Sequence, residues 1–576
     1  MIYKKDDMEK SETGESMKLD IHGFLAAKGL NIECLGQYED TGYYSPYNNL
    51  LNKFPKDQIF LDEDDQISFL DGYVYNKDAI IRNDTEDWQH AFAHAVKEDV
   101  QKCLQTLRGG FCGYQYDKKE NSLIAFTDQV SVKSLYYYTD GMRWMISNHL
   151  AYMVEVLKAN RILYSFHELA AQYMLTYGYM LDDSTFIKEI HRLLPGQYIH
   201  IGKGKAVATR YHSIQNIEIQ ISKDEAVEKL DTAFREAIRR EFEKDKEYGY
   251  RHLVDLSGGL DSRMISWVAH DMGYTDQVNF TYSRVNYYDE KISKQIAVYL
   301  EHEYFFKPLE DLKWMYDLEE ITAQNNGAAL YTGITGGRRA LSLLRMNQFG
   351  IEHTGMLGDV IIGTYHDKAT AHSKPVYGMN AYSNRLKYQY DEKILEEYPC
   401  QEIFCIYTRG ILGMSSTYMT RQHYIETASP FMDVDFMDIV FSLPFEYRYN
   451  HYIYLKWIKE KYPKAAEFGW EKWGGIKPKE SHIFLRKVKT TQRLLRQLAC
   501  KMLKLENADA MNPIEYWYQH NTELQHFYEK YYSDNIGASA IGEELRQDIQ
   551  NMFENGSATE KSMALTVLAV VKKYFD

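Results

Sequence analysis

The sequence has little of what marks membrane, secreted or zinc-binding proteins. Its 576 residues contain no run of about 18 apolar residues, the length that a membrane-spanning helix needs. Six cysteines lie far apart without a CxxC pair, so neither a disulfide framework nor a structural zinc site is expected. The first sixteen residues lack the apolar stretch of a signal peptide and suggest a disordered extension, with Met17 as an alternative start. A cytoplasmic location is the expectation.

Basic residues are outnumbered, and the two common nucleotide-binding patterns are missing. The formal net charge is -15, which disfavours general attraction to nucleic acid or to an anionic membrane. Neither the Walker pattern GxxxxGKS/T nor the dinucleotide pattern GxGxxG occurs. The chain is longer than the size at which a single hydrophobic core stops growing, so two or three domains are expected.

The N-terminal part has the pattern of an α+β domain. Short alternating runs broken by Gly, Asp and Asn between Gln58 and Ser147 predict hairpins of an antiparallel sheet. An apolar helical spacing between Asp87 and Leu107 predicts a helix within this region. The segment from His167 to Ile221 is interpreted as a connector with one helix and one strand.

The middle of the chain alternates strands and helices. Short apolar runs predict strands at 251–256, 277–282 and 303–306, with helices at 262–273 and 289–301 between them and another at 223–246. This alternation predicts a doubly wound parallel sheet, in which ligands bind at the carboxyl ends of the strands. The C-terminal third has further helical segments, including 451–462 and 562–575.

One glycine-rich hexapeptide, SGGLDS at 257–262, follows the first of these strands and opens a helix. Backbone N–H groups at such a junction bind phosphate oxygens well, and Gly258 and Gly259 permit a close approach. Ser257 and Ser262 add hydroxyl donors, whereas a carboxylate beside phosphates needs a cation, so Asp261 is a candidate Mg²⁺ ligand. The alternative is that the hexapeptide is only a helix-capping turn. The presence of the complete hexapeptide at a strand-to-helix junction favours phosphate binding over that alternative.

SGGLDS resembles the pyrophosphate loop of the N-type ATP pyrophosphatases, and several blocks in order resemble the asparagine synthetase family, which includes β-lactam synthetase and lasso-peptide cyclase relatives. The matching blocks, over roughly residues 60 to 480, are DGYVYNKDAI, RGGFCGYQYDKKENSLIAFTDQVSVKSLYYY, RLLPGQYIHI, TGMLGDVIIGTY and IETASPFMDVDFMDIVFSLP. The resemblance implies an α/β protein: an N-terminal α+β sandwich of the Ntn-hydrolase type, then a doubly wound pyrophosphate-loop synthetase domain with extra C-terminal helices.

The resemblance also implies a site. Lys472 would stabilise departing pyrophosphate, with Lys477 and Lys479 as substitutes, and Asp261 and Asp359 would hold Mg²⁺ beside the substrate ATP. Positively charged groups at a transferring phosphate act by neutralising charge. The ATP-binding residues implied are Leu256, Ser257, Gly258, Gly259, Leu260, Asp261, Ser262, Tyr282, Thr354 and Gly355.

The glutaminase half departs from the family pattern. The family's nucleophile is a cysteine directly after the initiator Met, whereas Ile2 and, after Met17, Lys18 stand here, and Cys34 is the first cysteine. Asp71 and Tyr73 stand at the positions where the family has the Asn and the Glu that bind glutamine. Neither the amide donor nor the ammonium-binding carboxylate is therefore retained. This half is expected to be inactive.

The synthetase half departs at two positions. Met356 replaces a glutamate and Ala428 an arginine of the matching blocks, so recognition of aspartate is not expected from the motif. The prediction is an ATP-dependent ligase that adenylates a small-molecule or peptide carboxylate and forms an amide with ammonia or an amine. The alternative is a non-catalytic ATP-binding scaffold. Two other reactions of pyrophosphate-loop proteins, tRNA thiolation and nucleotide amidation, are disfavoured because the sequence shows neither the catalytic cysteines nor the strongly basic RNA-binding region that they would need.

The expected organisation has four parts. They are an extension at 1–16, a glutaminase-like domain at 17–215, a synthetase-like domain at 216–490 and a C-terminal helical extension at 491–576. A homodimer is compatible with the pattern, and neither nucleic acid nor a membrane is an expected partner.

Overall fold

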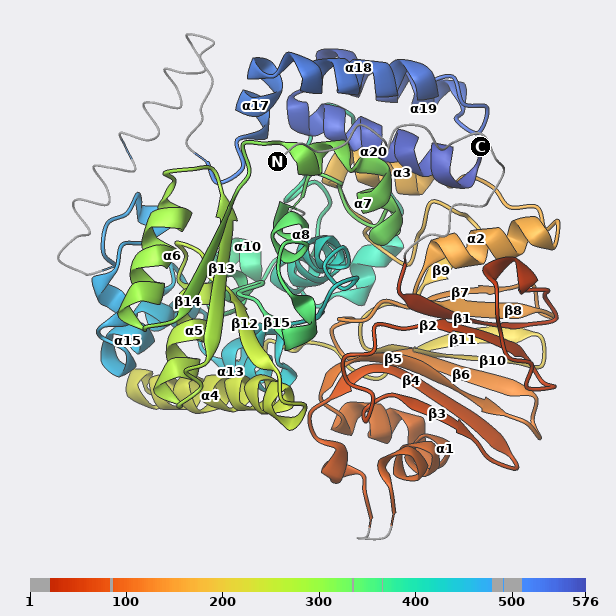
Figure 1. Ribbon diagram of the computed structural model, residues 1–576, viewed down its shortest axis with the longest axis horizontal. Coiled ribbons are helices and arrows are strands. Elements are labelled where there is room, and N and C mark those ends of the chain that lie inside the picture. Colours follow the sequence, from red (N-terminus) through yellow and green to blue (C-terminus); the bar gives the residue numbers. More distant parts are fainter. Residues whose placement is uncertain (1–20, 83–85, 334–335, 365, 479–490, 492–509) are drawn as a thin grey trace, which may run out of the picture.

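The computed structural model describes residues 21–82, 86–333, 336–364, 366–478, 491 and 510–576. The expected extension at 1–16, the alternative start Met17 and Lys479 lie outside these residues. Figure 1 shows two stacked antiparallel sheets on one side of the molecule and a parallel sheet among helices on the other. Within the described ranges, every helix is too short or too polar to span a lipid bilayer.

The N-terminal half is a sandwich of two antiparallel sheets. One sheet has the order β2-β1-β8-β7-β9 and the other β11-β10-β6-β5-β4-β3. The first sheet comprises β1 (Gly23–Lys28), β2 (Ser45–Asn49), β7 (Tyr136–Thr139), β8 (Trp144–Ser147) and β9 (His191–Arg192). The second comprises β3 (Ile59–Asp62), β4 (Gln66–Val74), β5 (Gly109–Asp117), β6 (Ser122–Thr127), β10 (Gln197–Gly202) and β11 (Lys205–Arg210). Inward-facing Phe24, Phe69 and Tyr114 fill the space between the sheets.

The interpretation of 167–221 as a connector was wrong for part of its length. After α3 (Glu168–Tyr177), this segment supplies β9, β10 and β11, which complete both sheets. The reason lies in the alternation of Ile199 and Ile201, whose buried side chains face the sandwich while β10 pairs with β6. The predicted helix at 87–107 is confirmed as α1 (Trp88–Thr106), which contacts β3.

The second half is built on a parallel sheet with the order β14-β13-β12-β15-β16. Its strands are β12 (Arg251–Asp255), β13 (Gln277–Ser283), β14 (Glu303–Pro308), β15 (Phe349–His353) and β16 (Glu426–Ala428). Numbered along the chain, this is the 3-2-1-4-5 order of a doubly wound sheet, whose direction reverses between β12 and β15. The predicted fold class is confirmed. Ligand sites are expected where the order reverses, at the carboxyl ends of β12 and β15.

Helices surround this sheet, and the ones predicted around its first three strands are confirmed. They are α4 (Lys223–Glu247), α5 (Asp261–Asp271) and α6 (Tyr288–Tyr299). Ser222 and Glu225 form a capping box that begins α4. The remaining helices of this half include α7 (Leu318–Gln324), α8 (Gly336–Leu341), α9 (Gly358–Ile361), α10 (Lys368–Ala371), α11 (Gln401–Cys405), a π-helix (Ile406–Ser415), α12 (Ser416–Tyr418), α13 (Val434–Ser442), α14 (Phe445–Arg448) and α15 (Tyr452–Lys461).

The C-terminal helices join the two halves. These are α17 (Ile514–His520), α18 (Thr522–Asn535), α19 (Glu543–Asn555) and α20 (Ala558–Tyr574), which lie across the top of Figure 1 above α3 and α7. One buried cluster includes Met153 of α2 (Leu150–Ala159), Phe280 of β13 and Leu568 of α20. The extension is therefore part of the main core. The domain boundaries suggested at 215/216 and 490/491 stay predictions.

Candidate active site at the glycine-rich loop

The loop between β12 and α5 is held in shape by its own serines. The backbone N–H of Ser257 donates to Ser262 Oγ at 2.8 Å, and the two hydroxyl oxygens lie 2.9 Å apart. Gly259 N–H donates to Ser257 Oγ at 3.2 Å. Leu260 occupies the N-cap of α5 and supplies no side-chain cap, so an anion can fill that role.

A second loop, after β15, packs closely onto the first because two glycines have no side chain. A Cβ at Gly355 would stand 2.6 Å from the backbone nitrogen of Ser262, and one at Gly358 would stand 2.6 Å from Asp261 Cγ. Such contacts are too short for any larger residue. The glycines of the TGMLGD block are therefore needed for the two loops to approach one another closely. This approach brings Asp359 to the N-terminus of α5.

Two carboxylates face one another across these loops. Asp359 N–H donates to Asp261 Oδ2 at 2.9 Å, and the buried Tyr454 hydroxyl donates to Asp261 Oδ1 at 2.9 Å. Burial and then repulsion from Asp359 raise the pKa of Asp261 to about 8. Burial also raises the pKa of Asp359, although Lys472 opposes that shift. Two carboxylates that repel one another in this way are a suitable donor set for a divalent cation.

Lys472 completes this group from a separate segment. Its Nζ lies 3.5 Å from Asp359 Oδ2, and its side chain is partly exposed. It stands on the short helix Glu471–Trp473, whose first N–H donates to the carbonyl of Gly258 at 3.1 Å. The lysine is thus attached to the glycine-rich loop. Lys477, a suggested substitute, pairs instead with Glu467 at 3.0 Å.

The loops border a cavity of about 510 Å³, called here the loop cavity. Of the predicted ATP-binding residues, those that line it are Ser257, Gly259, Asp261, Ser262, Tyr282 and Gly355. Gly258, Leu260, Leu256 and Thr354 do not line it. Leu256 is fully buried with its N–H bonded to Phe280, and Thr354 donates to the Ala428 carbonyl from both N–H and hydroxyl.

A buried arginine fixes Tyr282 at the edge of this cavity. Arg421 donates to the Tyr282 hydroxyl, to Glu352, and at 3.0 Å to Asp255 Oδ2. Its guanidinium also lies over the ring of Tyr418, 4.3 Å from the centroid. Sequence reasoning missed Tyr454, Tyr418 and Arg421, because they stand outside the matching blocks, in segments whose own sequence does not indicate a ligand site.

A second cavity of about 370 Å³, the side cavity, adjoins the first. The residues common to both are Leu357, Asp359, Val360 and Met414. Beyond them the side cavity is lined by Asn380, Glu402 and Arg409, among others. Glu402 is neutralised by a two-point pair with Arg448, at 2.9 and 2.8 Å.

Arg409 lines the side cavity, and among the residues that the structure describes it has no carboxylate partner. Its Nη1 donates to Asn380 Oδ1 at 3.2 Å, and its guanidinium lies over the ring of Tyr382. The π-helix that carries it also contributes Gly410 and Met414 to the cavity wall. π-Helices are frequent at functional sites. Nothing in its local sequence singles out Arg409.

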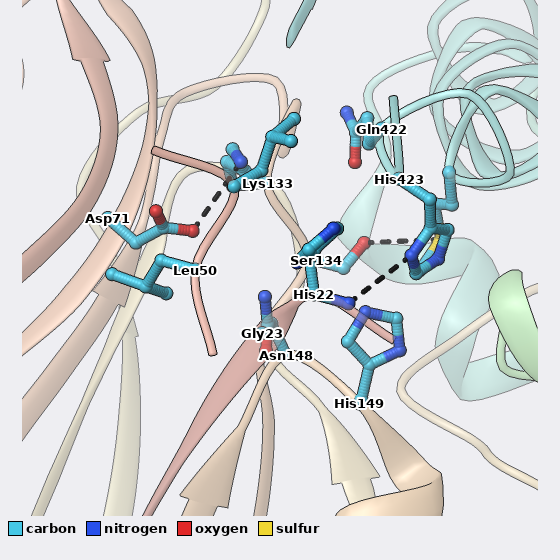
Figure 2. Close-up of a pocket in the computed structure, with 12 residues that line it drawn as sticks. His22, Gly23, Leu50, Asp71, Lys133, Ser134, Asn148, His149, Gln422 and His423 are labelled. Carbon is cyan, nitrogen blue, oxygen red and sulfur yellow. Dashed lines mark hydrogen bonds and ion pairs between the residues drawn. The ribbon is translucent and has the colours of Figure 1, made fainter. Parts of the chain in front are cut away.

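The glutaminase-like half contains a small pocket at the boundary with the second half (Figure 2). Asp71 lies in it, 3.4 Å from Lys133 Nζ, and Lys133 also pairs with Glu426 of β16 at 2.8 Å. These three groups are buried, so their charges depend on one another. Tyr73 lies nearby and donates its hydroxyl to the Thr427 carbonyl at 2.8 Å. Both altered residues of the glutamine-binding block therefore bind groups of the protein.

The same pocket is lined by histidines and by no cysteine among the described residues. His22 donates its N–H to His423 Nδ1 at 3.4 Å, and His149 lies beside the His423 ring (Figure 2). The space measures about 20 Å³, close to that of one water molecule. Cys34 is largely exposed and lies away from the pocket, and partial burial of its thiol together with the negative charge of Glu155 raises the pKa of that thiol. The part of the chain that the structure describes therefore places no cysteine in the pocket where Asp71 would position glutamine.

Comparisons with known proteins fit both halves. Residues 65–212 match the model of a glutamine amidotransferase domain. Glutamine-hydrolyzing asparagine synthetase 1 of Bacillus subtilis strain 168 is 25% identical over 307 residues, 52% of this chain and 44% of that protein. Asparagine synthetase 3 of the same organism, also glutamine-hydrolyzing, is 24% identical over 177 residues, 31% of this chain and 28% of that protein.

Among solved structures, a glutamine phosphoribosylpyrophosphate amidotransferase from B. subtilis aligns with 10% identity and a TM-score of 0.23, covering 51% of this chain and 87% of that one. The matched part spans under half the length of the two curated relatives. The sequence matches confirm the resemblance that the motifs predicted: about half of the chain is similar to an asparagine synthetase, and residues 65–212 match a glutamine amidotransferase domain.

Proposed function

We propose that this protein uses ATP to activate a carboxylic acid and then forms an amide. A carboxylate oxygen of the acid attacks the α-phosphorus, the bond to the β-phosphate oxygen breaks, and pyrophosphate leaves. The nitrogen of ammonia or an amine then attacks the acyl carbon, AMP leaves with the electron pair of the acyl C–O bond, and the nitrogen releases a proton to solution. The curated relatives are named as asparagine synthetases, which supports amide formation in general.

The observation that carries this proposal is the convergence of three charged groups on the glycine-rich loop. Asp261 opens α5, Asp359 follows β15, and Lys472 lies 3.5 Å from Asp359. All three lie where the strand order reverses, at the place expected for a ligand. A non-catalytic scaffold has no need of two mutually repelling carboxylates beside a lysine.

The donor set fits Mg²⁺. Oxygen ligands from carboxylates are what this ion prefers, and Asp261 and Asp359 would hold it. When bound, Mg²⁺ would neutralise charge on the phosphates. Lys472 adds a fixed positive charge at the same edge, where negative charge grows on the departing pyrophosphate.

The carboxylic acid fits the side cavity. This cavity meets the loop cavity at Asp359, so an acid in it can present its carboxylate to the α-phosphate. Its wall combines apolar Leu357, Val360 and Ile406 with the cation Arg409, a combination typical of sites for a small organic anion. The altered residues Met356 and Ala428 are consistent with an acid other than aspartate.

The nitrogen source we propose is free ammonia or an amine, although the relatives are named as glutamine-hydrolyzing. Glutamine binding at Asp71 would break its pair with Lys133 and leave buried charges uncompensated. The pocket that contains Asp71 has a volume of about 20 Å³, room for about one water molecule and far too little for glutamine. Both features argue against hydrolysis of glutamine in this pocket.

The test is product formation from a panel of acids and amines. We expect at least one pair to give AMP and pyrophosphate in equal amounts together with an amide detected by mass spectrometry. Asp261→Asn should abolish these products, since it removes a carboxylate from the cation site, whereas Asp271→Asn on the far end of α5 should not. ATP binding without products for every acid would support the scaffold instead.

A further inference from the structure

A buried arginine lies directly after the glycine-rich loop but outside the loop cavity. Arg263 follows Ser262 in the first turn of α5, and its side chain is fully buried. It is not among the residues that line the cavity. Within the described part of the chain its guanidinium has hydrogen-bond acceptors but no carboxylate partner. Burying a cation in this way is costly unless hydrogen bonds offset the loss of water, so its acceptors are an essential part of this structure.

The acceptors of this guanidinium are four backbone carbonyls from two places in the chain. One is the carbonyl of Gly258 in the glycine-rich loop, 3.4 Å from Nη2. The other three belong to the stretch that leads to Lys472. They are the carbonyls of Ala465 at 3.1 Å, Phe468 at 3.4 Å, and Gly469. Arg263 therefore bonds the loop to the chain that carries the lysine.

The chain at 465–476, called here the lysine segment, is folded so that this attachment reaches Lys472. Trp470 N–H donates to the Ile476 carbonyl at 2.9 Å, which closes the segment into a loop. The ring of Trp470 is buried, and Lys472 Nζ lies over it, 5.7 Å from the ring centroid. Trp470 directly follows Gly469, whose carbonyl the arginine binds. Fixing that carbonyl therefore also fixes the ring beneath the lysine.

A tyrosine of α6 holds the same segment from a second side. Tyr287 is buried and occupies the N-cap of α6, and its hydroxyl donates to Glu471 Oε1 at 2.7 Å. Glu471 directly precedes Lys472, and its own N–H donates to the Gly258 carbonyl at 3.1 Å. Two helices of the parallel-sheet half thus attach the lysine segment to the glycine-rich loop.

The position of Lys472 needs such support. Its side chain is partly exposed, and its Nζ lies 3.5 Å from Asp359 Oδ2, where the proposed reaction releases pyrophosphate. A lysine carries its charge on a flexible four-carbon stem. The ammonium is effective only where it meets the developing negative charge, and a misplacement of about 1 Å costs on the order of a hundredfold in rate.

We propose that Arg263 and Tyr287 are positioning residues for Lys472: they hold the lysine segment against the glycine-rich loop so that the ammonium meets the departing pyrophosphate. The inference rests on the proposed function. It adds two residues that line neither the loop cavity nor the side cavity and that stand outside the pattern at 257–262.

The experiment is a double-mutant cycle on the full chain, read out by exchange of labelled pyrophosphate into ATP. Arg263→Lys keeps the charge but cannot bond to both stretches, so exchange should fall about 10- to 100-fold. In a Lys472→Ala background the same change should cause no further fall, because the effects of residues that act as a unit are not additive. The Kd for ATP, measured by calorimetry, should stay at the wild-type value, since Ser257 and Ser262 keep their own bonds.

The matched control is Arg192→Lys, which changes another buried arginine. The hydroxyls that Arg192 binds, those of Ser134 and Ser416, lie outside the loop cavity, so exchange should continue at the wild-type rate. Circular dichroism and the thermal midpoint check that each variant folds. If Arg263→Lys does not fold, Tyr287→Phe takes its place. Loss of that one hydroxyl should lower exchange about three- to tenfold, and again only where Lys472 is present.

Three results would overturn the inference while leaving the proposed function intact. The first is exchange at the wild-type rate in Arg263→Lys or, in its place, Tyr287→Phe. The second is a fall of the same size with and without Lys472, which would mean that the two residues act through the core. The third is a rise in the Kd for ATP that accounts for the whole loss of exchange. Wild type that exchanges pyrophosphate with no acid would overturn both the inference and the proposed function.

Discussion

At the scale of single residues, we expect Arg409 to select which acids the side cavity accepts. Among the described residues its guanidinium has no carboxylate partner, because Glu402 is already paired with Arg448. Replacing it with glutamine should raise the KM for the acid about 10- to 100-fold, the effect of losing a charge-assisted hydrogen bond. The KM for ATP should stay unchanged, since Arg409 lies outside the loop cavity.

The control is Arg143→Gln, which removes a partly exposed arginine paired with Asp140 in the N-terminal half. Steady-state kinetics with varied acid and saturating ATP make the comparison. A higher KM for ATP with an unchanged KM for the acid would contradict the assignment of the side cavity.

At the scale of elements, the approach of the β15 loop to the β12 loop depends on Gly355. Its Cβ position is 2.6 Å from the Ser262 nitrogen, and neither backbone can retreat without disturbing its strand. Gly355→Ala should therefore weaken ATP binding more than tenfold and lower stability by roughly 1–3 kcal/mol. Gly537→Ala, with open space around its Cβ position, is the control. Tight ATP binding by Gly355→Ala, measured by calorimetry, would show that the loops are not in contact.

A buried charge group joins α4 to the parallel sheet and predicts a pH dependence. His353 of β15 lies between Glu241 and Asp245 of α4, 2.9 Å from each, and His252 of β12 also contacts Asp245. Burial opposes protonation of His353, but the hydrogen bonds to Asp245 and Glu241 outweigh it and raise its pKa to about 9. Burial raises the pKa of Glu241 to about 7, so Glu241 becomes charged as the pH rises through 7.

The sign of the effect follows from the raised pKa of His353. Its contribution to stability is complete below the ordinary histidine value of about 6.5 and is lost as the pH rises through 9. The free energy of unfolding should fall by roughly 2 kcal/mol between pH 7 and 9, since about 1.4 kcal/mol is lost per pH unit until half of the His353 side chains have lost their proton near pH 9. His353→Gln should remove this dependence, and exposed His200→Gln should keep it. Denaturant unfolding that is independent of pH in wild type would contradict the pairing.

Strands and helices with clear periodicity could be predicted from the sequence, but contacts between distant segments could not. The alternation from Arg251 onward predicted β12, β13 and β14, three of the five strands of the parallel sheet, because buried parallel strands are continuous apolar runs. The loop at 257–262 could be assigned since its chemistry is local. Lys133 and Arg409 could not be found, because the role of Lys133 arises from Glu426, almost three hundred residues away, and that of Arg409 from having no carboxylate partner among the described residues.

At the scale of the whole molecule, the boundary between the halves predicts that glutamine is not hydrolysed. Lys133 bridges Asp71 of the first half and Glu426 of the second, so the altered glutamine-binding block now stabilises the contact between the halves. Purified protein should release no glutamate from glutamine above the level of a buffer control, with or without ATP and acid. Ammonium or an amine should support product formation where glutamine does not. Sustained glutamate release that depends on the enzyme would contradict the account of this half.

Activation of a carboxylate at the glycine-rich loop is tested most directly by exchange of labelled pyrophosphate into ATP. With a suitable acid present, wild type should catalyse exchange that depends on the acid. Lys472→Ala should lose it by about 10²- to 10³-fold, the usual effect of removing one group that stabilises developing charge. Lys477→Ala, which removes a lysine paired with Glu467, should exchange at the wild-type rate. Exchange that persists in Lys472→Ala, or ATP binding by wild type without exchange for any acid, would contradict the account.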